Sequence, residues 1–278
     1  MRWLQIARKD FDDARRDRQL YYLLGILSLF ALGIGYIVGD NPEFVSPGQT
    51  AMVLIPVFAI LAPIVALTIS QADIVGKRAT GELSVLLSLP FSRRTIVLGS
   101  LVGRMAVMTV VLVAVFVLAP LVVSVRGAPV DPVALAGAFG MIWLLSLVFT
   151  AIALGISTFT RSTTLSAGGS FGVFLLFVMQ LWTVIPSGVR YLLNGLTMPS
   201  GPQPEWAAVF VQLSPFAALR NLAQPVVSEI VGSFPLAAGE VGESLPWYHE
   251  PVFAAIVVLA WIVLPLAAGY WRFQTTDL

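Results

Sequence analysis

The chain has 278 residues, of which 58% are hydrophobic and only 11% are charged, and its net charge is +1. Soluble globular domains carry about 25% charged residues, so this composition excludes a soluble protein and predicts an integral membrane protein. The sequence has no cysteine and one histidine, His249, which argues against disulfides, cysteine nucleophiles and metal sites within the chain. We therefore expect no metal and no cofactor.

Residues 1–19 precede the first apolar run and contain six basic and four acidic side chains. No small-residue cleavage site follows that run, so we expect the segment to be retained rather than removed as a signal peptide. Its apolar side chains recur at intervals of three and four residues, which predicts an amphipathic helix on the membrane surface. They are Trp3, Ala7, Phe11 and Ala14. The basic residues of the helix, Arg8 and Lys9 among them, suit anionic headgroups. Two roles stay open for it, a topology-setting anchor and a moving part.

Six stretches are apolar and long enough to form transmembrane helices, which need about 20 residues each. They cover residues 20–39, 50–72, 99–125, 132–158, 164–187 and 251–271. The predicted fold class is an all-α integral membrane protein with one transmembrane domain over residues 1–278. The apolar cores of these spans carry no ionisable residue, whereas ion-coupled transporters normally keep one at membrane depth. A transporter of this kind must take its energy from elsewhere.

The basic residues are distributed unequally between the two sides of the predicted membrane. Thirteen of the 16 Lys and Arg residues fall on the side that holds both termini, residues 73–104 and Arg161. Cytoplasmic segments carry such an excess, so we expect both termini in the cytoplasm and a multi-pass protein of the plasma membrane. The predicted outer side holds Arg126, Arg190 and Arg220, and leaving out the long last loop does not change the result.

Residues 188–250 form a long, net acidic loop on the predicted outer side. Its apolar stretch from Trp206 to Leu219 has 14 residues and is interrupted by Pro215. It is too short to span a membrane, so we predict a re-entrant or interfacial helix pair. A seventh and an eighth span remain the alternative.

Glycines four residues apart lie on one face of a helix and let two membrane helices approach closely. Three such pairs occur, with chance as the alternative explanation: Gly35 and Gly39, Gly99 and Gly103, and Gly168 and Gly172. Pro56 and Pro63 predict a kink or interrupted hydrogen bonds in the second span.

Two apparent motifs lack their structural context. The run from Gly168 to Gly172 matches the G-x-S-x-G nucleophile motif around Ser170, but it lies within a predicted span, and His249 is predicted at the outer surface. Helix packing explains these glycines better. Gly76-Lys77 resembles the end of a phosphate-binding loop, but Gln71 stands where the earlier glycine is required, so we expect no nucleotide site. We expect no nucleic-acid partner either.

Residues 73–98 form the second cytoplasmic segment. The short amphipathic stretch from Gly81 to Leu89 lies between two charged patches and ends at Pro90, before Ser92-Arg93-Arg94. A simple connection between two spans would not need such a helix. The segment therefore indicates a docking element that faces the cytosol.

This segment resembles the motif E-R-E-x-G-T-L-E-L-L-L-S-x-P-I-S-R, which follows the second span in the ABC-2 family of ABC transporter permeases. The matching residues are Gly81, Leu83, Leu86, Leu87, Ser88, Pro90, Ser92 and Arg93. Glu82 stands where the family usually has Thr, and Gly76-Lys77-Arg78 replaces its more acidic run. The stretch from Ile6 to Phe11 is similar to the family's A-R-K-E start, and Leu213 to Phe216 is similar to its outer-loop L-S-P. In length and layout the chain is similar to the permeases of the nitrous oxide reductase maturation (copper-processing) group.

The resemblance implies a permease that exports its substrate, pairs with a second permease half as a homodimer or heterodimer, and is powered by a separate ABC ATPase subunit. The chain itself would not be an enzyme. The residues implied to couple to the ATPase are Gly81, Glu82, Leu83, Leu86, Leu87, Pro90 and Arg93. The outer loop would gate the external side, with Pro215 and Phe216 at the gate. The alternative is an ATPase-coupled scaffold that acts on an extracytoplasmic maturation partner without bulk transport. An intramembrane protease built on Ser170 is a third class.

Overall fold

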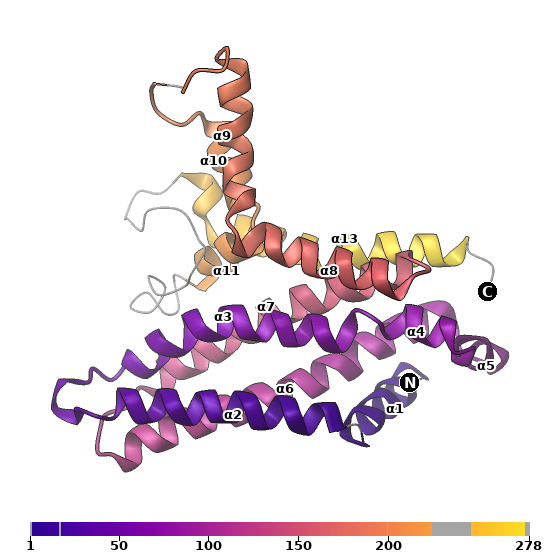
Figure 1. The fold of residues 1–278 in the computed structure, drawn as a ribbon, viewed down its shortest axis with the longest axis horizontal. Helices are drawn as coiled ribbons and strands as arrows, with labels where there is room; N and C mark the ends of the chain where they lie inside the picture. Colours follow the sequence, from indigo (N-terminus) through magenta and orange to yellow (C-terminus); the bar gives the residue numbers. More distant parts are fainter. Residues whose placement is uncertain (1, 17, 199, 224–245, 276–278) are drawn as a thin grey trace.

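The structure is a computed structural model that describes residues 2–16, 18–198, 200–223 and 246–275. Every regular element in this part of the chain is a helix, and most of the long helices run side by side along one axis (Figure 1). The α-helices are α1 (Arg2–Arg16), α2 (Arg18–Val38), α3 (Gln49–Ser70), α4 (Asp73–Ala79), α5 (Glu82–Ser88), α6 (Arg93–Val125), α7 (Pro132–Phe159), α8 (Thr163–Val178), α9 (Leu181–Leu193), α10 (Glu205–Gln212), α11 (Pro215–Ala223) and α13 (Pro251–Gln274). Two short 3₁₀ helices, η1 (Pro42–Phe44) and η2 (Trp247–His249), complete the described elements.

Five single helices are long and apolar enough to cross a membrane: α2, α3, α6, α7 and α13. The helices α8 and α9 meet the same criterion only as a pair, which is bent by 70°. The all-α membrane fold is thus confirmed, and the six predicted spans correspond to five single helices and one bent pair. The bend divides the predicted span 164–187 at Gln180, whose φ of 58° is left-handed. That conformation is uncommon for residues other than glycine, and no glycine or proline at this position indicates the bend in the sequence.

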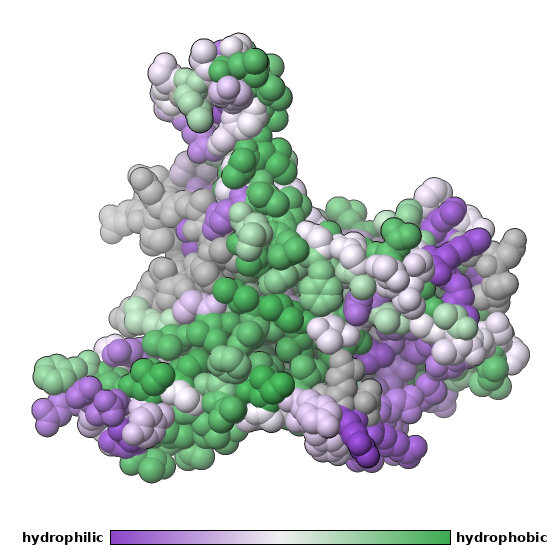
Figure 2. Space-filling model, viewed as in Figure 1, coloured by the Kyte–Doolittle hydropathy of each residue, from purple (hydrophilic) through white to green (hydrophobic). Residues whose placement is uncertain are grey.

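The surface of the long helices suits a lipid environment. Figure 2 shows hydrophobic residues along the middle of these helices and hydrophilic residues gathered at their two ends. Large apolar side chains are exposed on the outer faces of several spans, for example Leu29, Ile37, Val117 and Leu259. A monomeric soluble protein rarely exposes a contiguous apolar surface of this extent.

Two of the three predicted glycine pairs mediate close helix packing. A Cβ atom at Gly35 would lie 2.5 Å from the carbonyl oxygen of Ala119 on α6, and one at Gly99 would lie 2.6 Å from Cβ of Ile6 on α1. A Cβ atom at Gly103 would lie 3.0 Å from the carbonyl oxygen of Ala7 on α1, and one at Gly39 would lie 2.9 Å from the side chain of Arg126. A Cβ atom placed on Gly168 or Gly172 would meet no atom within 4 Å, so this third pair makes no close contact within the described chain.

The prolines of the second span do not end its helix. α3 remains helical from Gln49 to Ser70 through Pro56 and Pro63. A proline removes one backbone donor, which a membrane helix tolerates when neighbouring helices surround it. Pro63 is itself buried, and α3 packs mainly against α7.

Two short helices, α10 and α11, lie in the predicted outer loop. α10 and α11 meet at Leu213-Ser214, just before Pro215, and α11 is buried against α13 and α7. α9 and α10 rise away from the bundle as an arm (Figure 1). The later part of the predicted loop, residues 224–245, lies outside the described residues. Whether the pair enters the membrane stays a prediction.

Candidate functional site

The predicted docking segment is built from two short helices and a glycine hinge. α4 ends at Ala79, Gly81 adopts φ +77°, and α5 begins at Glu82. Only glycine takes this left-handed conformation without strain, so Gly81 sets the angle between the two helices. Beyond α5, the side chain of Ser92 accepts a hydrogen bond from the backbone N–H of Thr95 and caps α6. α5 covers Glu82–Ser88, so a helix is present within the predicted stretch from Gly81 to Leu89.

α5 turns one apolar face inward and one outward. Leu83 and Leu86 are buried in a small core that includes Ile6 of α1, Ile96 of α6 and Phe273 of α13, and Leu87 packs against this core. Val85 and Leu89 are 63% and 48% exposed on the other face. Leu83 and Leu86 thus fix α5 to its own chain, which leaves Val85 and Leu89 as the apolar side chains that a partner can reach.

α1 packs on α6 with a buried face that differs in part from the predicted one. Ile6, Ala7 and Asp10 are buried, whereas Trp3 and Phe11 are only half-buried. A Cβ atom at Gly103 would lie 2.9 Å from Cβ of Asp10, so this glycine gives the aspartate its place beside α6. A helix is present here, but its inner face contacts protein, and Arg8 and Lys9 project from its exposed side; its place on the membrane surface stays a prediction.

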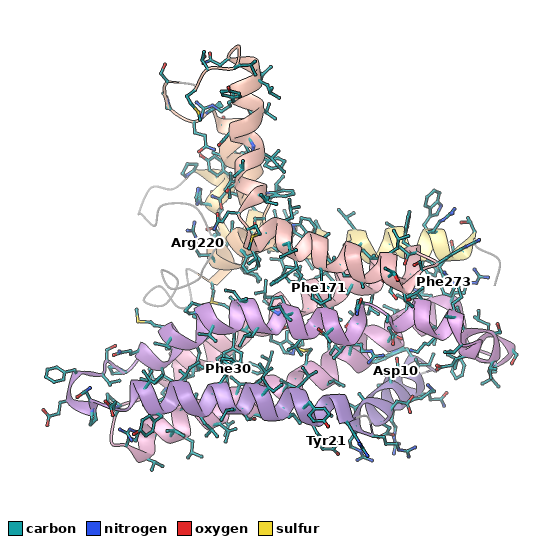
Figure 3. The ribbon with its side chains drawn as sticks, in the orientation of Figure 1. Asp10, Tyr21, Phe30, Phe171, Arg220 and Phe273 are labelled. Atoms are coloured by element: carbon teal, nitrogen blue, oxygen red, sulfur yellow. The ribbon has the colours of Figure 1, made fainter. Side chains whose placement is uncertain are left out.

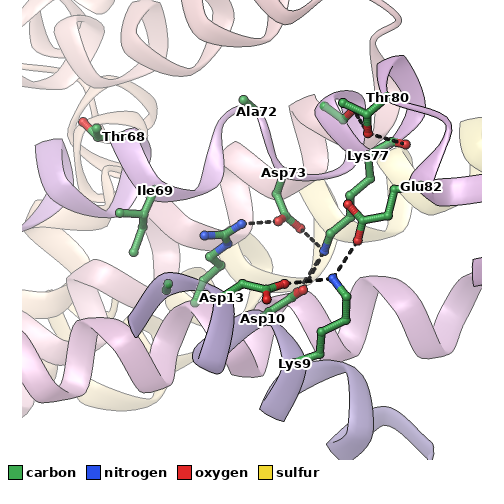
Figure 4. Close-up of a pocket in the computed structure, with 13 residues that line it drawn as sticks. Lys9, Asp10, Asp13, Thr68, Ile69, Ala72, Asp73, Lys77, Thr80 and Glu82 are labelled. Atoms are coloured by element: carbon green, nitrogen blue, oxygen red, sulfur yellow. Dashed lines mark hydrogen bonds and ion pairs between the residues drawn. The ribbon is translucent and has the colours of Figure 1, made fainter. Parts of the chain in front are cut away.

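A cluster of buried charges joins α1, α4 and α6, and Figure 4 labels Asp10, Asp73 and Lys77 within it. Together with Ser100 and Arg104, we call these residues the inner charge cluster. Lys77 Nζ donates to both carboxylate oxygens of Asp10, at 3.0 and 2.9 Å, and to Ser100 Oγ at 2.9 Å. It also lies 3.3 Å from Oδ2 of Asp73, one turn earlier on α4. Arg104 of α6 forms an ion pair with Asp73, and Ser100 donates to Asp10 at 2.9 Å. Two carboxylates and two cations therefore balance in charge.

A second, more exposed pair connects α1 to α5. Lys9 Nζ donates to Glu82 at 2.7 Å and to Asp13 at 2.9 Å, and its side chain is 43% exposed. Partial burial lowers the pKa of Lys9, but its hydrogen bonds and charge interactions with Glu82 and Asp13 outweigh this, so the net pKa is raised above its ordinary value. Lys9 and Glu82, predicted for two different roles, are thus direct partners.

A cavity of about 350 Å³ lies between these two sets of charges, and polar side chains line much of it. Those that carry charge are Lys9, Asp10, Asp13, Asp73, Lys77 and Glu82, with Arg104 beside them. Among the described residues, no group of three His, Cys, Asp or Glu side chains is arranged to hold a metal ion. The carboxylates here bind cationic side chains instead, and these contacts form a junction of the four helices α1, α4, α5 and α6.

Arg93 lies at the edge of this junction. Its guanidinium donates to the carbonyl oxygen of Phe273 and lies over the Phe273 ring, with Cζ 4.9 Å from the ring centroid. It therefore connects the start of α6 to the end of α13.

The predicted gate residues are far from the inner charge cluster. Figure 3 shows Arg220 of α11 well apart from Asp10 and Phe273. Pro215 and Phe216 are buried, and Phe216 joins an aromatic cluster with Phe149, at 6.0 Å between ring centroids. Trp261 Nε1 donates to the carbonyl oxygen of Leu213 at 2.7 Å, which holds the break between α10 and α11 against α13.

The inner charge cluster has no direct signature in the sequence. The sequence pattern places Lys77 on an altered docking surface, but the structure buries it beneath that surface. Two weaker signals point to the cluster: Asp10 interrupts the apolar side of α1, and Asp73 and Lys77 stand four apart. Ser170 and His249 make no contact with each other in the described structure, which gives no support to a protease site.

Comparisons with known proteins give a consistent result along the whole chain. The family model described as ABC-2 family transporter protein matches residues 4–278. A protein of Pseudomonas aeruginosa described as probable ABC transporter permease protein NosY is 27% identical over 276 residues, which cover 96% of each chain. A protein of Stutzerimonas stutzeri with the same description is 29% identical over 280 residues, covering 97% of this chain and 96% of the relative.

Proposed function

The chain belongs to the ABC-2 family of transporter proteins, and we propose that it is one membrane half of an ABC exporter whose ATP is hydrolysed by a separate subunit. The naming of both relatives as ABC transporter permeases supports this function. The observation that carries the proposal is the position of α5, which is held from within by Leu83 and Leu86 and presents Val85 and Leu89 outward.

In this proposal, the ATPase binds the exposed face of α5, and the inner charge cluster passes the movement on. α5 follows α4 directly, and α4 shares Lys77 with α1 and Asp73 with α6 through ion pairs. A displacement of α5 would therefore reach the spans α3 and α6 together with α1. This gives α1 a moving role, the second of the two roles that its sequence left open.

The remaining assignments follow from the same proposal. Residues 1–278 form one permease domain with both termini in the cytoplasm, as the excess of basic residues on that side supports. A second permease half, identical or related, completes the path. Pro215 and Phe216 act at the outer gate, where α11 is packed between α7 and α13.

A second candidate function is the ATPase-coupled scaffold, and the arm formed by α9 and α10 favours it. The arm projects from the bundle (Figure 1) and exposes Leu192 and Leu193 near its end. Such a surface suits an extracytoplasmic partner. In this alternative the same ATPase would move the arm instead of a substrate.

The test is to co-purify the full-length chain with the ATPase expressed alongside it and to measure both assembly and ATP hydrolysis. Val85→Asp places a charge on the exposed face of α5 and is expected to abolish co-purification. Leu192→Asp, an equally exposed apolar position on the arm, is the matched control and should leave assembly unchanged. Normal assembly and turnover of Val85→Asp would refute docking through α5. Loss of an outer partner in Leu192→Asp, with transport intact, would favour the scaffold.

A further inference from the structure

Arginines from three segments converge where α13 ends. Arg78 of α4 donates through Nη1 to the carbonyl oxygen of Thr160 at 2.8 Å, which places it next to Arg161 in the turn between α7 and α8. Arg93, at the start of α6, donates to the carbonyl oxygen of Phe273. These contacts connect α4 to the turn after α7, and the start of α6 to the end of α13.

The guanidinium groups of Arg78 and Arg93 lie over the same aromatic ring. Their Cζ atoms are 5.6 and 4.9 Å from the centroid of Phe273, a fully buried side chain. The negative face of an aromatic ring attracts such cations. Phe273 thus holds two positive charges close together that would otherwise repel each other.

Two of these arginines lack a carboxylate that would neutralise them. Arg78 and Arg161 have no ion pair in the described part of the chain, and Nε and Nη2 of Arg78 are buried without a hydrogen-bond partner. The charges of Arg93 and Arg161 both act on Arg78. Like charges held together in this way raise the affinity of the site for an anion.

An apolar groove begins one helical turn further into the bundle. Its volume is about 160 Å³, and it runs between α7 and α13. Its lining residues are Gly155, Ile156, Phe159, Pro265, Ala268 and Gly269. Phe159 directly precedes Thr160, and Gly269 is one turn before Phe273, so the groove continues from the arginines toward the membrane interior. Trp271, two residues after Gly269 on α13, is exposed, as tryptophan at a membrane boundary commonly is.

We propose that Arg78, Arg93 and Arg161 bind the phosphate of an anionic phospholipid, with an acyl chain lying in the groove between α7 and α13. The arrangement of a charged end followed by an apolar channel fits an amphiphile rather than the acidic surface of a protein. Since α7 and α13 both qualify as spanning helices, we expect the open side of the groove to meet the acyl chains of the bilayer. The site shares Phe273 with the small core that holds α5, and its assignment to the cytoplasmic leaflet rests on the proposed topology.

The test uses the full-length chain in detergent and native mass spectrometry. The chain is titrated with dioleoyl phosphatidylglycerol and, in parallel, with the zwitterionic dioleoyl phosphatidylcholine, which has the same acyl chains. We expect about tenfold tighter binding of the anionic lipid. Arg161→Gln, an exposed position that should fold normally, is expected to weaken that binding about fivefold, as the loss of one basic contact with an anionic lipid does. Arg94→Gln, an exposed arginine outside the convergence, should leave it unchanged.

Further arms separate the sources of the phosphate and the partners of the arginines. Ala268→Phe fills the groove and should weaken lipid binding. If this variant binds the lipid as tightly as the wild type, and inorganic phosphate displaces the lipid equally well from both, the ligand is a free anion. Equal binding of the two lipids, or an equal loss in Arg94→Gln, would overturn the proposal. Intact lipid binding in Arg161→Gln and in Arg78→Gln, with loss of ATPase assembly, would assign the arginines to a protein surface instead.

Discussion

Replacing Lys77 by methionine is expected to destabilise the protein by about 3–5 kcal/mol, the usual cost of removing one partner from a buried ion pair. Lys77 and Asp10 are 7% and 2% exposed, so neither charge can be solvated in place of its partner. Methionine is similar in length but has no charge, which leaves the Asp10 carboxylate with the hydroxyl of Ser100 alone. Asp73 keeps its ion pair with Arg104 and should remain ionised.

Removing both charges should restore most of this loss. Lys77→Met combined with Asp10→Leu eliminates the carboxylate together with its partner, and buried pairs replaced by apolar residues often cost about 1 kcal/mol or less. Lys9→Met is the matched control, since it breaks the half-exposed pair with Glu82 and should cost no more than about 1 kcal/mol.

The free energy of unfolding is measured by denaturant titration in detergent micelles, followed by tryptophan fluorescence. The expected order of destabilisation is Lys77→Met first, then the double variant and Lys9→Met together. A loss below about 1 kcal/mol for Lys77→Met would refute the buried cluster. A double variant as unstable as the single one would show that packing, and not the unpaired charge, causes the loss.

Gly99→Ala and Gly168→Ala should change stability in opposite directions. A Cβ atom at Gly99 would meet Ile6 at 2.6 Å and force α1 away, at a cost of about 1–3 kcal/mol. A Cβ atom at Gly168 meets nothing within 4 Å and should stabilise the helix by about 0.5–1 kcal/mol. Denaturant titration of both variants checks this, and equal effects would contradict the close approach of α1. Burial first, and then the charge of Arg220, lower the pKa of His249, so the folded protein disfavours the protonated imidazole. Stability is therefore expected to fall as the pH drops below about 6.5, the ordinary pKa of histidine, and His249→Gln should flatten the pH dependence of thermal unfolding between pH 7 and 5; an unchanged slope would contradict the burial of His249.

The spans and the docking helix could be predicted because each follows from local composition. A run of apolar residues between charges needs only its own length to be identified, and the stretch from Gly81 to Pro90 carries its start and stop signals within ten residues. The bend at Gln180 could not be predicted in the same way. Aromatic side chains on the elements that follow pack around the bend, and Trp182 stacks on Phe210 with 4.5 Å between the ring centroids. The glutamine itself does not indicate a left-handed turn.

The face of a helix that carries function depends on its neighbours, and periodicity alone does not decide it. The apolar residues of α5 alternate between two faces, and the sequence could not tell that Leu83 and Leu86 face the chain while Val85 and Leu89 face outward. The inner charge cluster escaped prediction for a related reason. Its members Asp10, Asp73 and Arg104 come from segments separated by up to 94 positions in the sequence, and only tertiary packing brings them together.

The two sets of ion pairs differ in burial, and this difference bears on which helices move together. Buried pairs keep most of their interaction energy, whereas half-exposed pairs are screened by water and salt. α1, α4 and α6 share the buried pairs, so we expect them to move as one body. α5 is joined to α1 through the half-exposed pair of Lys9 and Glu82, and Gly81 provides its hinge. An ATPase that displaces α5 therefore acts on the screened Lys9–Glu82 pair and on the core around Leu83 and Leu86, which includes Ile6 of α1, before the load reaches the buried cluster. High ionic strength should loosen the contact of α5 with α1 and leave the attachment of α1 to α6 intact, which cross-linking between cysteines introduced on each pair of helices would reveal.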